Sequence, residues 1–272
     1  MVSTKEMMDI ALELVGFEVV PADSAIYVEG KNIRKVLFGI DADIPELFLA
    51  KQLGYDAVIS HHPKGGLAVI NFHRVFSRHI QQMVNAGVPK YEAEEAVRKK
   101  LTALEAEMHA KNYSHAVDAA RLLNMPYMNV HTPLDELGRK KMTQKIRCEI
   151  GKDATVGDII SVLKKLPEFK KAKTDIKACV GNTANLAGKI VVSHGAGTNG
   201  GYEIAKTYFK HGINTLIYIH ISPVDLEKLK ADGVGNLIIT GHIASDSLGI
   251  NPYIKELENR DVSVTRLGII PP

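Results

Sequence analysis

The stretch DAVISHHPKGG, residues 56–66, decides the interpretation of this chain. Four residues of strand-like character run straight into two adjacent histidines, a proline and a pair of glycines. Similar short apolar runs occur at 36–41 (VLFGID) and 127–132 (YMNVHT), and the segment at 44–54 between the first two has a helical pattern. This alternation of strand and helix predicts an α/β fold with mixed sheets covered by helices.

A second series of alternating elements begins near residue 141. Strands are expected at 145–150 (KIRCEI), 175–181 and 215–222, with a helix after a Thr155 cap. We therefore predict two α/β lobes. The first comprises residues 1–140 plus 236–272 and contains a helical insertion at about 91–124, and the second comprises residues 141–235.

Composition and charge narrow the classes of function. The chain has 272 residues, of which 45% are hydrophobic and 24% charged, as in ordinary globular proteins. A net charge of +3 gives no support for nucleic-acid binding or for an anionic membrane surface. Its two cysteines, Cys148 and Cys179, fit neither a disulfide framework nor a zinc ribbon, so we expect a cytoplasmic protein. No signal peptide or membrane-spanning run is expected.

Histidines and carboxylates follow three of the expected strands. His61 and His62 end the first, and the other two carry His–Asp pairs at a spacing of four residues, His131 with Asp135 and His242 with Asp246. If helices begin there, each pair shares one helix face. Such N and O ligands at one sheet edge suit zinc, iron, manganese or cobalt.

Each of these patterns alone has a plainer interpretation. A single H-x-x-x-D sequence is typical of a capping or surface pair, and adjacent histidines point in different directions. Their joint occurrence at the carboxyl ends of strands favours a metal site. Two neighbouring ions could then take one histidine each and share a carboxylate.

The three segments, in this order, resemble the family of NGG-one-interacting factor three, often labelled GTP cyclohydrolase type 2 homologues. FGIDADIPELFLAKQLGYDAVISHHP (38–63), HTPLD (131–135) and TGHIASD (240–246) are similar to its motifs. The resemblance implies two α/β lobes, a ring-shaped homohexamer and a centre of two divalent ions. The implied ligands are His61, His62, Asp135, His242 and Asp246, with His131 beside them as a second-shell group or proton carrier.

Three features depart from the family pattern. Asp246 replaces a glutamate and can bridge only if the backbone comes closer. The HHP turn continues with KGG, in which Lys64 either faces solvent or reaches a substrate phosphate. About seventy residues separate HHP from HTPLD, roughly twice the usual interval, and the surplus at 91–124 would cover the site, shape its entrance or alter assembly.

The loop GAGTNGG, residues 195–201, matches the G-x-G-x-x-G pattern of dinucleotide sites. The acidic residue that such a site needs after the next strand is replaced by His220, which argues against a nicotinamide cofactor. The loop then serves as an anion cradle or a tight turn. His194 and His220 end neighbouring strands. We expect both to be structural histidines with satisfied hydrogen bonds, rather than groups that face a cavity.

The expected function is hydrolysis of a small molecule, such as a nucleotide, by two divalent metal ions that activate water. His131 would carry the proton. A different class, a non-catalytic regulatory or carrier protein that binds metal, uses the same ligands in a closed site. A ring that encircles nucleic acid would need a basic inner wall, which the net charge does not support.

Overall fold

Two mixed β-sheets organise the chain, as the sequence predicts. The computed structural model describes all residues, 1–272. The first sheet has strand order β1-β4-β3-β2-β9, with β1 antiparallel to β4 and all other neighbours parallel. Its strands are β1 (Ala25–Val28), β2 (Lys35–Gly39), β3 (Ala57–Ser60), β4 (Tyr127–Asn129) and β9 (Ser263–Leu267).

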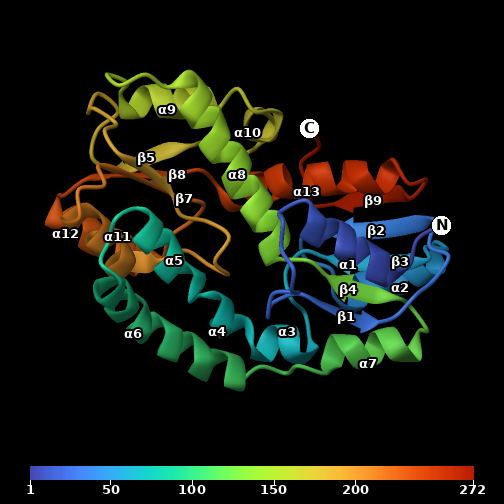
Figure 1. Ribbon diagram of the computed structural model, residues 1–272. Coiled ribbons are helices and arrows are strands. Elements are labelled where there is room, and N and C mark those ends of the chain that lie inside the picture. The colour runs from blue at the N-terminus through green and yellow to red at the C-terminus, as the bar shows by residue number, and fades with distance from the viewer.

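The second sheet repeats this plan with four strands in the order β5-β8-β7-β6 (Figure 1). Strands β6, β7 and β8 are parallel, and β5 is an antiparallel edge strand. The strands are β5 (Lys177–Val180), β6 (Ile190–Val192), β7 (Thr215–Tyr218) and β8 (Asn236–Ile239).

Thirteen helices cover the two sheets. Those before β4 are α1 (Thr4–Glu13), α2 (Ile44–Gln52), α3 (Gly66–Ile70), α4 (Phe72–Val75), α5 (Arg78–Asn85), α6 (Lys90–His109) and α7 (His115–Leu122). Those after β4 are α8 (Thr132–Glu149), α9 (Val156–Leu163), α10 (Pro167–Lys171), α11 (Gly201–Lys210), α12 (Pro223–Asp232) and α13 (His242–Glu258). None has the combination of length and apolar content that crossing a membrane requires.

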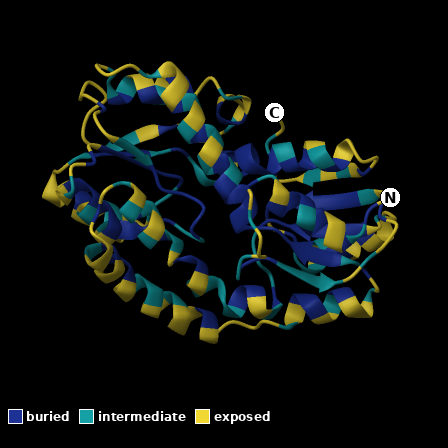
Figure 2. Cartoon of the chain, in the orientation of Figure 1, coloured by how far each residue is buried: buried dark blue, intermediate teal, exposed yellow.

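Each sheet is buried on both faces, which explains its continuous apolar strands. In β2, Val36 and Phe38 pack with α1 and α13, whereas Leu37 between them packs with α2 and α7. The second sheet has α5, α6 and α11 on one face and α8, α9 and the start of α13 on the other. In Figure 2 the central strands of both sheets are largely dark blue, whereas the edge strands β1 and β9 are not, and the outer helix faces are yellow.

Helix α8 runs between the two sheets and packs against α13 (Figure 1). The sequence KIRCEI, expected as a strand, is instead the last part of α8. The helix extends there because Met142 and Ile146, four residues apart, bury the same face against the second sheet's core. That expectation was wrong because a short apolar run does not distinguish a strand from a buried helix turn.

The sheets do not follow the expected lobe boundaries at two places. Strand β8 pairs with β5 and β7 in the second sheet, although residues from 236 onward were expected in the first lobe. Residues of α5 and α6 also belong to the second sheet's core, where Met83 and Val97 pack with Tyr208. The two predicted lobes, one of residues 1–140 plus 236–272 and the other of residues 141–235, thus stay a prediction.

The KGG sequence after the paired histidines has a packing reason. A Cβ on Gly65 would lie 2.5 Å from a methyl group of Val117 and 3.0 Å from the carbonyl oxygen of Tyr113, so only glycine fits beneath α7. Gly66 has a positive φ of 57°. Lys64 is paired with a carboxylate, because its Nζ lies 2.8 Å from Asp41 Oδ1.

Candidate metal centre

Six histidines follow the carboxyl ends of parallel strands in both sheets. They come one to three residues after β3, β4, β6, β7 and β8, and they are His61, His62, His131, His194, His220 and His242. The carboxyl edges of the two sheets meet at one place, because the ring of His62 lies 5.1 Å from that of His242 and His194 lies beside Asp135. This arrangement brings together all the ligands that the sequence predicts.

His61 presents a bare nitrogen to a carboxylate. Its Nδ1 lies 2.9 Å from the carbonyl oxygen of Val130, so Nδ1 carries the proton and donates it. Its Nε2 then offers a lone pair, which lies 3.1 Å from Asp135 Oδ1 and 3.8 Å from Asp246 Oδ2. Burial lowers the pKa of His61, which favours this neutral form.

His62 is oriented in the same way by Asp41. Its Nδ1 lies 3.0 Å from Asp41 Oδ1, and its Nε2 lies 3.5 Å from Asp246 Oδ2. Burial lowers the pKa of His62, but the carboxylates of Asp246 and Asp41 outweigh it and raise the pKa to about 9. The position therefore favours positive charge, from a proton or from another cation.

His131 is the residue before the first turn of α8, and Asp23 holds it. Its Nδ1 lies 2.7 Å from Asp23 Oδ2, which also accepts from Thr132 Oγ1 at 2.6 Å. Its Nε2 lies 3.6 Å from Asp135 Oδ2. Burial lowers the pKa of His131, and the charges of Asp135 and Asp23 overcome this and raise it. Histidines held through Nδ1 by a carboxylate or carbonyl are typical of metal centres.

The two carboxylates lie on helices α8 and α13, as their spacing from the histidines predicts. His242 Nε2 is 3.1 Å from Asp246 Oδ2, so each His–Asp pair shares one helix face. Asp135 and Asp246 are 3% and 1% exposed. Burial raises the pKa of Asp135, but the imidazoles of His194 and His131 outweigh burial and hold it below its usual range.

Four buried side-chain atoms of this site have no hydrogen-bond partner. They are His61 Nε2, Asp135 Oδ1, Asp246 Oδ2 and His194 Nε2. A nitrogen lone pair that faces a carboxylate oxygen at 3.1 Å is repulsive unless a cation lies near both. Buried charges of this kind are stabilised by pairing or by metal coordination. The residues present therefore fit divalent cations.

Three groups of three residues place their ligand atoms close enough together to hold a metal ion. His61, Asp135 and Asp246 form one group, and His62, His242 and Asp246 form a second, with all ligand atoms in each within 4.8 Å of one another. Asp246 belongs to both groups despite being shorter than glutamate. A third group joins His61, His62 and His131, which places the predicted proton carrier within ligand distance too.

The second sheet contributes residues that the sequence analysis did not assign to the site. A small cavity of about 20 Å³ lies at the site and has room for one water-sized occupant. Its lining includes Asp135, Asp246, His194 and His220. His194 is not a satisfied structural histidine, since its Nε2 has no partner and lies 3.6 Å from Asp135 Oδ1. The sequence did carry a signal for His194, because, like the histidines of the first lobe, it comes soon after a parallel strand.

His220 holds its proton on the nitrogen away from the loop. Asn199 Oδ1 accepts from the Gly201 N–H at 3.0 Å and from Lys100 Nζ at 3.3 Å, so Asn199 Nδ2 donates to His220 Nδ1 at 3.1 Å. The proton of neutral His220 therefore lies on Nε2. Burial lowers the pKa of His220 to about 4, and its ring lies 4.7 Å from that of His242.

The glycine-rich loop forms one wall of this cavity, and the helical insertion contacts the loop. Gly195 and Gly197 have φ values of 71° and 80°, and a Cβ on Gly195 would lie 3.1 Å from the backbone of Glu136 on α8. Lys100 of α6 donates to the carbonyl oxygen of Asn199 at 2.6 Å. Of the roles considered for the insertion, this contact supports shaping the site.

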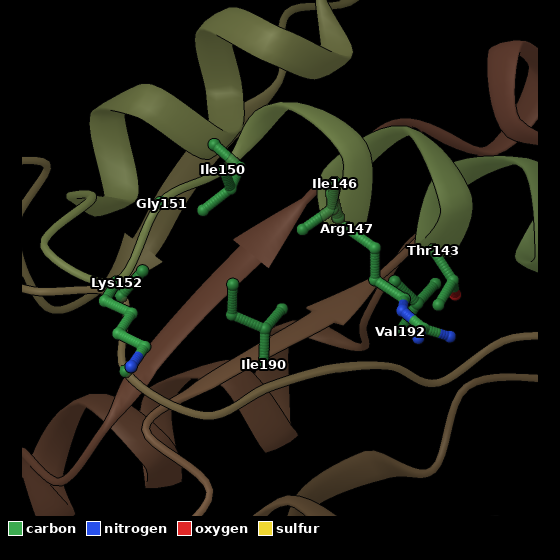
Figure 3. A pocket seen from close by; sticks show the side chains of 10 residues that line it. Thr143, Ile146, Arg147, Ile150, Gly151, Lys152, Ile190 and Val192 are labelled. Carbon is green, nitrogen blue, oxygen red and sulfur yellow. The ribbon is translucent and has the colours of Figure 1, made fainter.

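A larger pocket, of about 340 Å³, lies between the end of α8 and strand β6 (Figure 3). Ile146, Ile150 and Ile190 line it together with the basic groups of Arg147 and Lys152. It contains no histidine or carboxylate that could hold a metal. This larger pocket is therefore not a candidate metal site.

Searches for a matching family model and for matching curated proteins found none. Among solved structures, a NIF3 superfamily protein from Sphaerobacter thermophilus is 48% identical, with 98% of each chain covered and a TM-score of 0.97. A hypothetical protein from Staphylococcus aureus (14% identity, 97% and 95% covered, TM-score 0.55) and a Bacillus cereus protein related to NIF3 (10%, 97% and 96%, 0.51) share the fold alone. The label of GTP cyclohydrolase type 2 homologue stays a prediction. The identity and coverage of the first structure show that this chain belongs to the NIF3 superfamily.

Proposed function

We propose that this protein is a metal-dependent hydrolase with two divalent ions at the facing edges of its sheets. The observation that carries the proposal is the set of buried, unpartnered ligand atoms on His61, Asp135 and Asp246. One ion would be held by these three residues, and the other by His62, His242 and Asp246, so that Asp246 bridges. Zinc, iron and manganese all suit such N and O ligands.

When bound, two divalent ions supply Lewis-acid polarisation of the bond under attack and make nearby water more acidic. The chain's own residues then position the reactants and move the protons. His131 accepts a proton at Nε2, because its Nδ1–H is committed to Asp23. The Asp23 carboxylate stabilises the imidazolium that results, as in other Asp–His pairs.

His220 can donate a hydrogen bond into the cavity. Its Nε2–H is free because Asn199 occupies Nδ1. With its pKa near 4, the ring is neutral at pH 7 and acts as a hydrogen-bond donor rather than a cation. We assign it to hold an oxygen of the substrate at the cavity.

The substrate proposal is a small molecule with a hydrolysable bond, such as a purine nucleotide, which the family label favours. The cavity of about 20 Å³ is too small for a nucleotide, so contact would occur at its mouth. The side chains of His62 and His242 are 21% and 39% exposed there. These two histidines would meet the substrate first.

Metal analysis of the purified protein, followed by hydrolysis assays on nucleotides and simple phosphoesters with added manganese, zinc or iron, tests the proposal. His62→Ala and Asp135→Ala should each lose metal while circular dichroism shows a retained fold. Hydrolysis that continues at full rate after complete demetallation would refute the mechanism.

A metal-binding carrier or regulator without turnover is the second candidate. The small volume of the cavity favours it, because storage and structural sites are closed to substrate. The two functions differ in what the metal site exchanges with solution. A catalytic centre binds a small anion such as inorganic phosphate beside its ions, whereas a carrier releases the metal itself to an acceptor. Isothermal titration of the metal-loaded protein with phosphate separates them.

The resemblance also suggests a homohexameric ring in the cytoplasm. Light scattering coupled to size-exclusion chromatography measures the number of chains in the assembly directly. A mass of one chain, about 30 kDa given 29.8 kDa per protomer, would rule out the ring.

A further inference from the structure

The loop after β6 carries a buried histidine that the two proposed ion sites leave unused. The His194 side chain is 4% exposed, its Nε2 lacks a hydrogen-bond partner, and this atom lies 3.6 Å from Asp135 Oδ1. An imidazole nitrogen that is buried without a hydrogen-bond partner is destabilising. Something must offset this cost in the functional protein.

The backbone of this histidine and of the next residue is held by two side-chain hydrogen bonds. Gln82 Nε2 donates to the carbonyl oxygen of His194 at 2.6 Å, and Arg78 Nε donates to that of Gly195 at 2.8 Å. A Cβ at Gly195 would crowd Glu136 on α8, so the loop approaches the α8 backbone as closely as glycine allows. The imidazole is thus presented to Asp135 by a prearranged loop.

The cavity beside His194 is suited to a cation. Three of its lining residues, Asp135, Asp246 and His194, each contribute a buried atom without a partner. Two ligands that each lie about 2.1 Å from one ion are about 3.0–4.2 Å apart. The 3.6 Å between His194 Nε2 and Asp135 Oδ1 lies within that range.

We propose that His194 is a metal ligand supplied by the second sheet, so that the ion bound at Asp135 joins the two sheets. This inference rests on the proposed metal centre. His194 is in none of the three ligand groups whose atoms lie within 4.8 Å of one another. An ion bound to both His194 and Asp135 would fasten the loop 193–199 to helix α8, so the docking of the two sheets becomes metal-dependent.

A plainer role is that His194 donates a hydrogen bond to Asp135 without touching metal. Two substitutions separate these roles. Glutamine at this position keeps an N–H donor and offers no imidazole, whereas alanine removes both. His220→Gln is the matched control, since it changes another histidine of the same cavity whose Nδ1 is occupied by Asn199.

The experiment measures Co²⁺ and Zn²⁺ affinity by chelator competition for the wild type, His194→Ala, His194→Gln and His220→Gln. X-ray absorption of the loaded proteins counts imidazole ligands. We expect both His194 variants to bind at least one ion on the order of 100-fold more weakly and to lose one imidazole from the spectrum, while His220→Gln matches the wild type. Rescue by glutamine, or an equal loss in His220→Gln, would overturn the ligand assignment.

Stability measurements give a second, independent readout. Metal should raise the unfolding temperature of the wild type and slow hydrogen exchange in residues 193–200, and both responses should shrink in His194→Ala. Each response is measured against the same protein without metal, because replacing a buried imidazole changes the baseline stability by itself. An unchanged metal response in the variant would refute the role of His194. A wild type that binds no metal would instead refute the metal centre itself.

Discussion

His61 Nε2 lies 3.1 Å from Asp135 Oδ1, and neither atom has a hydrogen-bond partner. The two residues come from different elements, the end of β3 and the first turn of α8. Because the Nδ1–H of His61 is committed to Val130, the facing atoms are both electron-pair donors. A cation between them removes the repulsion, and this relation underlies the predictions below.

Asp135→Asn should abolish the stabilisation that metal provides. At a free metal concentration of 100 times the Kd, binding raises the free energy of unfolding by about 2.7 kcal/mol. The amide is a poor ligand and cannot restore the charge, so this increment should disappear. Denaturant unfolding with and without added zinc measures it. Asp118→Asn, at an exposed pair with Arg121, is the control and should keep the full increment.

Asp23→Asn should shift the ring proton of neutral His131 from Nδ1 to Nε2. In the wild type, histidine ¹⁵N chemical shifts of the zinc-loaded protein should report Nδ1–H for His131, because Asp23 accepts it at 2.7 Å. The amide can donate instead, which favours the other tautomer. Hydrolysis should slow by about 10²–10⁴-fold while metal content is retained. An unaltered tautomer in the variant would contradict this account.

Gly249→Ala should disrupt the packing that brings Asp135 and Asp246 together. A Cβ there would lie 1.9 Å from the carbonyl oxygen of Leu134 on α8, which is backbone and cannot move aside alone. We expect a loss of about 2 kcal/mol or more in unfolding free energy, together with weaker metal binding. Gly151→Ala, where a Cβ meets open space, should change stability by less than about 0.5 kcal/mol.

Stability should fall in mild acid because of His79. Burial lowers the pKa of His79 to about 4 in the folded protein, below its ordinary value of 6.5. Between these two values the unfolded chain binds a proton that the folded chain does not. The unfolding free energy therefore declines as pH falls from about 6.5 to about 4, by about 3 kcal/mol from this residue.

Chemical denaturation of the metal-free protein at a series of pH values checks this slope. His79→Gln keeps a donor for the Thr198 carbonyl oxygen, which His79 Nε2 contacts at 2.9 Å, and does not titrate. Its pH dependence should be flatter than that of the wild type. Parallel curves for the two proteins would show that His79 is not responsible.

Local signals in the sequence were sufficient for many elements. The α/β class and helix α9 with its Thr155 cap follow from short-range periodicity and capping. The sharing of one helix face by His242 and Asp246 follows from helix geometry alone. These features depend on residues a few positions apart, which is why the sequence predicts them.

The sequence by itself determined that five ligand-type residues stand at the ends of buried strands or in the helix turns that follow, and that they belong to one family pattern. Only the tertiary structure decided that the second sheet meets the first at this edge, with His194 beside Asp135 and α6 behind Asn199. The reason is physical. The contacts that orient the site, such as that between Asp23 and His131, join residues 108 positions apart. Such contacts arise from the packing of whole sheets and helices, which leaves no periodic trace in the local sequence.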